Sequence, residues 1–135
     1  MSTILIVDDD MRHRELFCDV LQADGHTTLT AENGTQAVEL ASSATPDLIL
    51  MDVQMGEMGG VEALSELRKT PALAAVPVIA VTALAMDGDK EWLLAAGFDE
   101  YVSKPVDIGT IRDVVRRHAS HVANAAPAQD GRTRR

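Results

Sequence analysis

The 135-residue chain has little of what small secreted or membrane proteins depend on. Cys18 is its only cysteine, which excludes an internal disulfide, and we interpret it as a packing residue on an apolar helix. No apolar run approaches the ~20 residues of a membrane span, and residues 1–3 lack the basic flank of a signal peptide. We therefore expect a cytoplasmic protein with no membrane insertion.

Aromatic and basic residues are also scarce. Aromatic residues make up 3% of the chain, so Val, Ile, Leu, Ala and Met must fill the core, which favours a parallel sheet packed under helices. Lys and Arg number 12 against 21 Asp and Glu, for a net charge of -9. Because phosphate contacts need clustered basic residues, this balance argues against direct nucleic-acid binding.

What the sequence does contain is a fivefold alternation of short Val/Ile/Leu runs with longer helical patterns. Strands are predicted at 4–7, 27–31, 48–52, 78–82 and 101–103. Helices are predicted at 11–23, from Asn33, from about Val61, at 87–96 and from an Asp107 cap. This pattern predicts an α/β fold with a five-stranded parallel sheet in the order 2-1-3-4-5, flanked by five helices, which is flavodoxin-like.

The apolar pattern fades at about Ala119. The last sixteen residues are rich in Ala and carry Pro127, Gly131 and several arginines, with no periodic apolar face. We therefore predict one domain over residues 1–119 and a disordered tail over 120–135.

Polar side chains gather where the predicted strands end. Asp52 is a lone carboxylate that closes the apolar run 48–51, in the position where a parallel sheet binds its ligands. The carboxyl ends of the neighbouring strands carry Asp8, Asp9, Asp10, Thr82 and Lys104. We expect these side chains to share one crevice, with Asp10 acting as a helix cap rather than a ligand.

Clustered carboxylates need a cation to balance their charge. Hard oxygen ligands suit Mg²⁺, or Mn²⁺, and Asp9 and Asp52 are the predicted direct ligands. A carboxylate can attack phosphorus when a metal and a Lys ammonium neutralise the transferring group, which gives Lys104 a role. The Thr82 hydroxyl can donate to a phosphoryl oxygen and so sense its arrival.

Four motifs in this order resemble the response-regulator receiver domain over about residues 3–119. They are Ile6-Val7-Asp8-Asp9, Leu50-Met51-Asp52-Val53-Gln54-Met55, Thr82-Ala83 and Tyr101-Val102-Ser103-Lys104-Pro105. One departure is Gly56, where receivers commonly have proline, which leaves the loop 54–60 less restricted.

The resemblance implies a phosphorylation switch of a two-component system. Asp52 would accept a phosphoryl group from a sensor histidine kinase or a phosphotransfer protein, and the receiver would catalyse its own phosphorylation and dephosphorylation. The implied remaining site consists of Asp9, Asp52 and the Gln54 backbone carbonyl on Mg²⁺, Asp8 through water, Lys104 on the phosphoryl group, Thr82 and Tyr101 as the switch pair, and a cis bond before Pro105.

Two other classes of function stay open from the residues. An aspartyl-phosphate phosphatase usually has a second Asp two residues after its nucleophile, but this chain has Gln54 there. A non-phosphorylated binding module of the same fold, or a flavin carrier, would leave the acidic pocket without purpose, and Asp8 to Asp10 would repel a flavin phosphate.

A downstream protein target is expected to bind the last two helices and the strand between them. Trp92, Leu93 and Leu94 cannot all face the core of one helix, so we predict that Trp92 lies at the edge, on a partner surface. Simple packing of Trp92 and of Tyr101 is the alternative. The chain is expected to be a monomer or a phosphorylation-dependent dimer.

Overall fold

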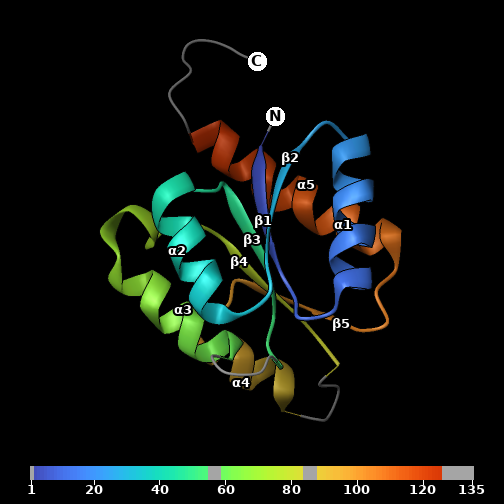
Figure 1. Ribbon diagram of the computed structural model, residues 1–135. Helices are drawn as coiled ribbons and strands as arrows, with labels where there is room; N and C mark the ends of the chain where they lie inside the picture. Colours follow the sequence, from blue (N-terminus) through green and yellow to red (C-terminus); the bar gives the residue numbers. More distant parts are fainter. Residues whose placement is uncertain (1, 55–58, 84–87, 126–135) are drawn as a thin grey trace.

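The computed structural model describes residues 2–54, 59–83 and 88–125, with side chains up to residue 118, and these form a parallel five-stranded sheet (Figure 1). The strand order is β2-β1-β3-β4-β5, as predicted. The elements are β1 (Thr3–Val7), α1 (Met11–Ala23), β2 (Thr27–Ala31), α2 (Gly34–Ala44), β3 (Leu48–Asp52), α3 (Gly60–Lys69), a 3₁₀ turn (Pro71–Leu73), β4 (Val78–Thr82), α4 (Asp89–Ala96), β5 (Glu100–Ser103) and α5 (Ile108–Ala125).

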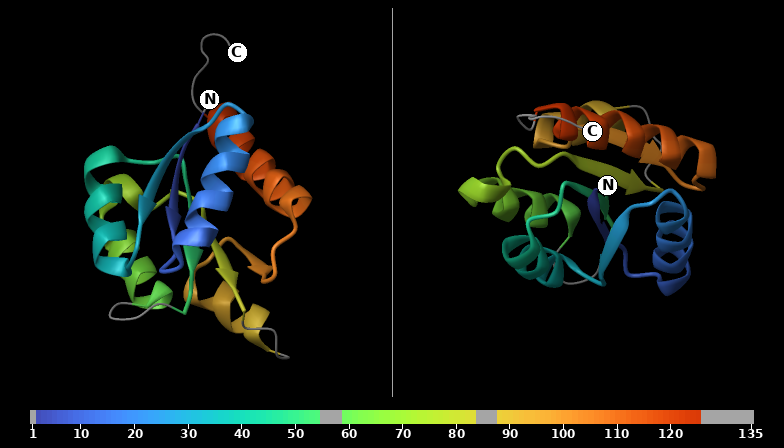
Figure 2. Two further views of the ribbon diagram at one scale, coloured as in Figure 1. Left: turned by 45° about the vertical axis from the view of Figure 1, so that its right-hand side comes forward. Right: turned by 90° about the horizontal axis from the view of Figure 1, so that it is seen from above.

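The helices cover both faces of the sheet because successive strand side chains point to opposite sides (Figure 2). Ile4 and Ile6 of β1 pack with buried residues of α1 and α5. Leu5 and Val7 of the same strand pack with buried residues of α2, α3 and α4. The central strands β3 and β4 are buried at every position, as expected for strands that are covered twice.

Local signals in the sequence set the helix ends. Asp10, Asn33 and Asp107 each accept a hydrogen bond from a backbone N–H of the helix that follows. At the carboxyl end of α4, the cap residue Gly97 has a φ of 118°, a left-handed conformation that costs glycine little. The predicted caps are therefore confirmed.

The last helix extends beyond the predicted boundary. Residues 120–125, which we assigned to a disordered tail, belong to α5, whereas residues 126–135 lie outside the described part. Strand β5 likewise begins one residue earlier than predicted, at Glu100. Within the described ranges, no helix is both long and apolar enough to cross a membrane.

Strand register brings the predicted site residues to one edge of the sheet. Val7 of β1 pairs with Met51 of β3, so the next residues along these two strands, Asp8 and Asp52, lie side by side. Thr82 pairs with Ser103, and the Lys104 backbone N–H donates to the Thr82 carbonyl at 2.8 Å. The carboxyl ends of β1, β3, β4 and β5 therefore meet, as expected for parallel strands.

Candidate functional site

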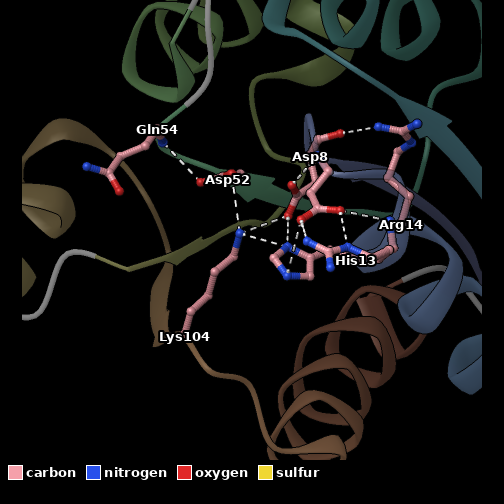
Figure 3. Close-up of polar contacts among 8 residues, drawn as sticks. Asp8, His13, Arg14, Asp52, Gln54 and Lys104 are labelled. Atoms are coloured by element: carbon pink, nitrogen blue, oxygen red, sulfur yellow. Dashed lines mark hydrogen bonds and ion pairs between the residues drawn. The ribbon is translucent and has the colours of Figure 1, made fainter.

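Asp52 ends β3 as a buried carboxylate, with 5% of its surface exposed. Its Oδ1 accepts a hydrogen bond from the Gln54 backbone N–H at 3.0 Å, and its Oδ2 lies 3.3 Å from Lys104 Nζ (Figure 3). Burial raises the pKa of Asp52, although the Gln54 hydrogen bond and the Lys104 charge oppose the increase. The carboxylate is therefore held in place but costs free energy when it is charged.

Gly60, the first residue of α3, lies directly against the end of β3. The Gly60 N–H donates to the Val53 carbonyl at 3.1 Å. A Cβ at Gly60 would lie 2.8 Å from Val53 Cα and 2.9 Å from the Asp52 carbonyl oxygen. Only glycine lets the first turn of α3 approach the end of β3 this closely.

Lys104 follows β5 and links the two buried carboxylates, Asp8 and Asp52, which lie at the ends of β1 and β3. Its ammonium lies 3.0 Å from Asp8 Oδ2 and 3.3 Å from Asp52 Oδ2. Burial alone would lower the pKa of Lys104, but the hydrogen bond to Asp8 and the charge of Asp52 outweigh it, so the pKa is raised. A permanent positive charge therefore stands beside Asp52.

Asp8 is fixed by its own backbone surroundings. It is 1% exposed, and its Oδ1 accepts the Asp10 N–H at 2.9 Å. Arg14 Nη1 from α1 donates to the Asp8 carbonyl at 2.7 Å (Figure 3). The other carboxylate oxygen, Oδ2, faces Lys104.

Three carboxylates form a group that fits a divalent cation. Oxygen atoms of Asp8, Asp9 and Asp52 all lie within 4.8 Å of one another, with Asp9 on the solvent side. Three negative charges against the one positive charge of Lys104 leave an excess of two. Hard oxygen donors with this charge excess match the ligand preference of Mg²⁺.

The remaining predicted residues lie around this group. Thr82 is fully buried at the end of β4, and Tyr101 in β5 is partly buried against the core on the α2–α3–α4 side. The peptide bond between Lys104 and Pro105 is cis, as the resemblance implied. The switching roles of Thr82 and Tyr101 stay predictions.

The sequence argument overlooked His13. Its Nδ1 lies 3.3 Å from Asp8 Oδ2 and 3.2 Å from Lys104 Nζ (Figure 3). The signal was present, because a residue three positions after an Asp N-cap lies in the first turn of its helix, over the same edge of the sheet. The sequence argument also overlooked Arg14, which lies in the same turn of α1 and donates to the Asp8 carbonyl.

A cavity of about 420 Å³ opens beside the site, between α1 and the segment after β5. Its lining includes His13, Leu16 and Phe17 from α1, and Lys104, Pro105 and Val106. Apart from His13 and Lys104, the residues that line it are apolar.

Trp92 lies on α4, away from the carboxylates. It is 50% exposed, whereas the adjacent Leu93 is fully buried and Leu94 is 39% exposed. The predicted edge position of Trp92 is confirmed, and its role in binding a partner stays a prediction.

Comparison with known proteins identifies the class that this fold and site define. The response regulator receiver domain family matches residues 4–116, so the chain belongs to this family. The resemblance found in the motifs is therefore confirmed.

Within this family, the chain is similar in sequence to the response regulator DivK of several Brucella species. The chain is 38% identical over 117 residues to the polar-differentiation response regulator DivK of Brucella anthropi, covering 87% of this chain and 95% of that protein. DivK of Brucella ovis is 37% identical over the same length, with the same coverage. The chain is thus similar to DivK response regulators over nearly their whole length.

Solved structures agree with this assignment. Chemotaxis protein CheY4 of Vibrio cholerae superposes with a TM-score of 0.82 at 28% identity, over 87% of this chain and 98% of that one. The receiver domain of a sensor histidine kinase from Pseudomonas aeruginosa gives a TM-score of 0.81 at 31% identity, over 88% and 98%. That receiver has a magnesium ion coordinated in its active site cleft.

Proposed function

We propose that this receiver is a phosphorylation-dependent signalling switch that accepts a phosphoryl group on Asp52. The observation that carries the proposal is the Lys104 ammonium, which bridges Asp8 at 3.0 Å and Asp52 at 3.3 Å beside a three-carboxylate group. This arrangement provides a nucleophile, a fixed positive charge and a metal-ligand set at one point. Phosphoryl transfer needs all three.

The donor is the phosphohistidine of a sensor histidine kinase or of a phosphotransfer protein. An Asp52 carboxylate oxygen attacks phosphorus and forms the P–O bond, while the P–N bond to the donor breaks and its electron pair returns to the imidazole. Lys104 holds its positive charge against the phosphoryl oxygens during the transfer. Water later attacks phosphorus, the P–O bond to Asp52 breaks, and inorganic phosphate leaves with the Asp52 carboxylate restored.

Mg²⁺, or Mn²⁺ in its place, is the metal that this site would take. Asp9 and Asp52 would hold it directly with the Gln54 backbone carbonyl, and Asp8 would hold it through water. When bound, the metal neutralises charge on the transferring group. The spacing of the three carboxylates within 4.8 Å supports this ligand set.

The phosphoryl group would shift an equilibrium between two states of the domain. Thr82 lies at the end of β4 and would move toward the phosphoryl group, with Tyr101 following in the neighbouring strand. The change would reach the face of α4, β5 and α5, where a downstream protein target binds. The 50% exposure of Trp92 on α4 supports a partner surface there.

The first test is covalent labelling. The protein incubated with acetyl phosphate and Mg²⁺ should gain one phosphoryl group by intact-protein mass spectrometry, and Asp52→Asn should abolish the gain. Asp113→Asn, which alters an exposed carboxylate on α5, is the matched control and should label normally. Adding EDTA should prevent labelling; undiminished labelling would contradict the metal assignment, and no adduct at all would overturn the switch.

The second test concerns the partner surface. Trp92 is the only tryptophan of the chain, so its fluorescence reports on α4 alone. Labelling should shift the emission of Trp92, and Asp52→Asn should show no shift under the same conditions. An unchanged spectrum in fully labelled protein would detach Trp92 from the switch.

A cytoplasmic location and a monomer that stays monomeric or dimerises on phosphorylation belong to this proposal. Light scattering of labelled and unlabelled protein distinguishes the two assembly states.

A further inference from the structure

His13 has a place in the site that the three carboxylates and Lys104 do not account for. Its imidazole comes from the first turn of α1 and has 39% of its side chain exposed, on the wall of the cavity beside Lys104. The ring lies against Phe17, with 6.5 Å between ring centroids and 32° between planes. Packing on one side therefore limits the ring's orientation.

The ring nitrogen Nδ1 faces two groups and can serve only one of them. It lies 3.2 Å from Lys104 Nζ, which can only donate, and 3.3 Å from the Asp8 carboxylate, which can only accept. The contact with Lys104 is the shorter of the two, and an ammonium can only donate, so we assign it as a hydrogen bond from Lys104 Nζ to His13 Nδ1.

The other ring nitrogen favours the same tautomer. Nε2 lies 3.8 Å from Asp10 Oδ2, too far for a hydrogen bond but close enough for the charge to favour a proton on Nε2. Hydrogen bonds from Arg12 lower the pKa of Asp10 to about 2, so this carboxylate is charged near neutral pH. With Nε2 protonated, Nδ1 keeps its lone pair for Lys104.

We propose that His13 is a positioning residue for phosphoryl transfer, whose Nδ1 accepts the third hydrogen bond of the Lys104 ammonium and keeps it aimed at the phosphoacceptor. The inference rests on the proposed phosphorylation of Asp52. An ammonium has three donors, and Asp8, Asp52 and His13 together satisfy all three.

A neutral acceptor is suited to this position. The lysine stem is flexible, so its ammonium needs fixed partners to stay in one place. A fourth carboxylate would add negative charge to a group that already has three and would compete for the cation. An imidazole nitrogen orients Lys104 without either effect.

The test compares three substitutions by the rate of labelling with acetyl phosphate and Mg²⁺. His13→Leu keeps bulk beside Phe17 but has no acceptor, and should slow labelling about tenfold, the effect of one lost hydrogen bond to a charged group. His13→Asn should recover most of the rate, because Asn Oδ1 and His Nδ1 are both bonded to Cγ. Leu16→Ala, a change in the same cavity wall without polar contact, should leave the rate within about twofold.

A double-mutant cycle with Lys104→Ala separates positioning from a general structural effect. If His13 acts through Lys104, His13→Leu should cause no further slowing once Lys104 is absent. Equal rates for wild type and His13→Leu, no recovery by His13→Asn, or a full additional loss in the Lys104→Ala background would each overturn the inference. If the wild-type protein itself failed to label, the proposed function would fall first and this inference with it.

Discussion

Asp52 is a charged residue in a place where charge is costly. Burial raises its pKa above the ordinary 3.8, even though Lys104 and the Gln54 N–H act in the opposite direction. A carboxyl group whose pKa rises on folding stabilises the native state fully below pH 3.8, and this contribution is lost as the pH rises through the folded value. Near neutral pH, the metal-free protein therefore carries a destabilising charge at its own reaction centre.

Asp52→Asn should therefore stabilise the protein at pH 7 in EDTA. We expect a gain of about 1 kcal/mol in the free energy of unfolding, since an uncharged amide escapes most of the desolvation penalty. The gain should shrink as the pH falls toward 3.8. Thermal unfolding of both proteins from pH 4 to pH 8 measures it.

Asp10→Asn is the control of opposite sign. Hydrogen bonds from Arg12 lower the pKa of Asp10 to about 2, so its charge favours the native state above pH 3.8 and loses that effect as the pH falls toward 2. Removing it should not stabilise the protein at pH 7. A destabilised Asp52→Asn at pH 7 would mean that the ion pair with Lys104 outweighs burial.

Among single residues, the site residues at strand ends could be predicted from the sequence, whereas those on helix α1 could not. Asp52 and Thr82 each close an apolar run and Lys104 follows a short strand, and parallel pairing carries such residues to one edge. His13 follows no run, and its contact with Lys104 spans 91 positions. Its place depends on how α1 packs against the sheet, which the helical pattern alone does not specify.

Among the secondary-structure elements, Arg68 of α3 joins several segments through one guanidinium. Its nitrogens lie 2.7 Å from the Val76 carbonyl, 3.1 Å from that of Ala74 and 3.2 Å from that of Gly97. It also pairs with Asp99 Oδ2 at 3.0 Å, the atom that accepts the Val78 N–H. The end of α3, the start of β4 and the end of α4 are thus connected at the edge opposite the carboxylates.

Arg68→Ala should destabilise the protein by about 2 kcal/mol, because it leaves partly buried carbonyls and Asp99 without this donor. Urea unfolding should show a lower midpoint with an unchanged slope. Lys69→Ala is the neighbouring control: Lys69 is exposed and forms a surface ion pair with Glu66, so we expect a change below about 0.5 kcal/mol. Similar losses for the two variants would show that Arg68 has no special role.

The helix boundaries show what an apolar pattern can and cannot predict. The residues of α1 and the strands β2, β3 and β4 were predicted to the residue, because glycine stops, caps and buried runs coincide with their ends. The predicted end of α5 was wrong, since the apolar residues on which the prediction rested end at Val115 while the helix continues to Ala125. Arg117 and His118 instead pair with Glu100 of β5, a polar anchor that hydrophobic periodicity does not register.

The whole molecule has a net charge of -9, and three of its carboxylates lie together at one edge of the sheet. Any cation gains from the general negative field, but such binding is weak and screened by salt. Mg²⁺ at the carboxylate group would also relieve the cost of the buried Asp52 charge. Metal binding and stability should therefore be linked.

Mg²⁺ should raise the unfolding temperature of the unlabelled protein. Binding to the native state alone at ten times the dissociation constant adds about 1.4 kcal/mol, or roughly 4 °C for a domain of this size. NaCl at matched ionic strength controls for screening, and Asp113→Asn should show the same gain as the wild type. Asp52→Asn should gain much less, because it lacks a direct ligand. A gain of equal size in Asp52→Asn, or with NaCl alone, would place the effect in the general field of the protein and remove Asp52 from the metal site.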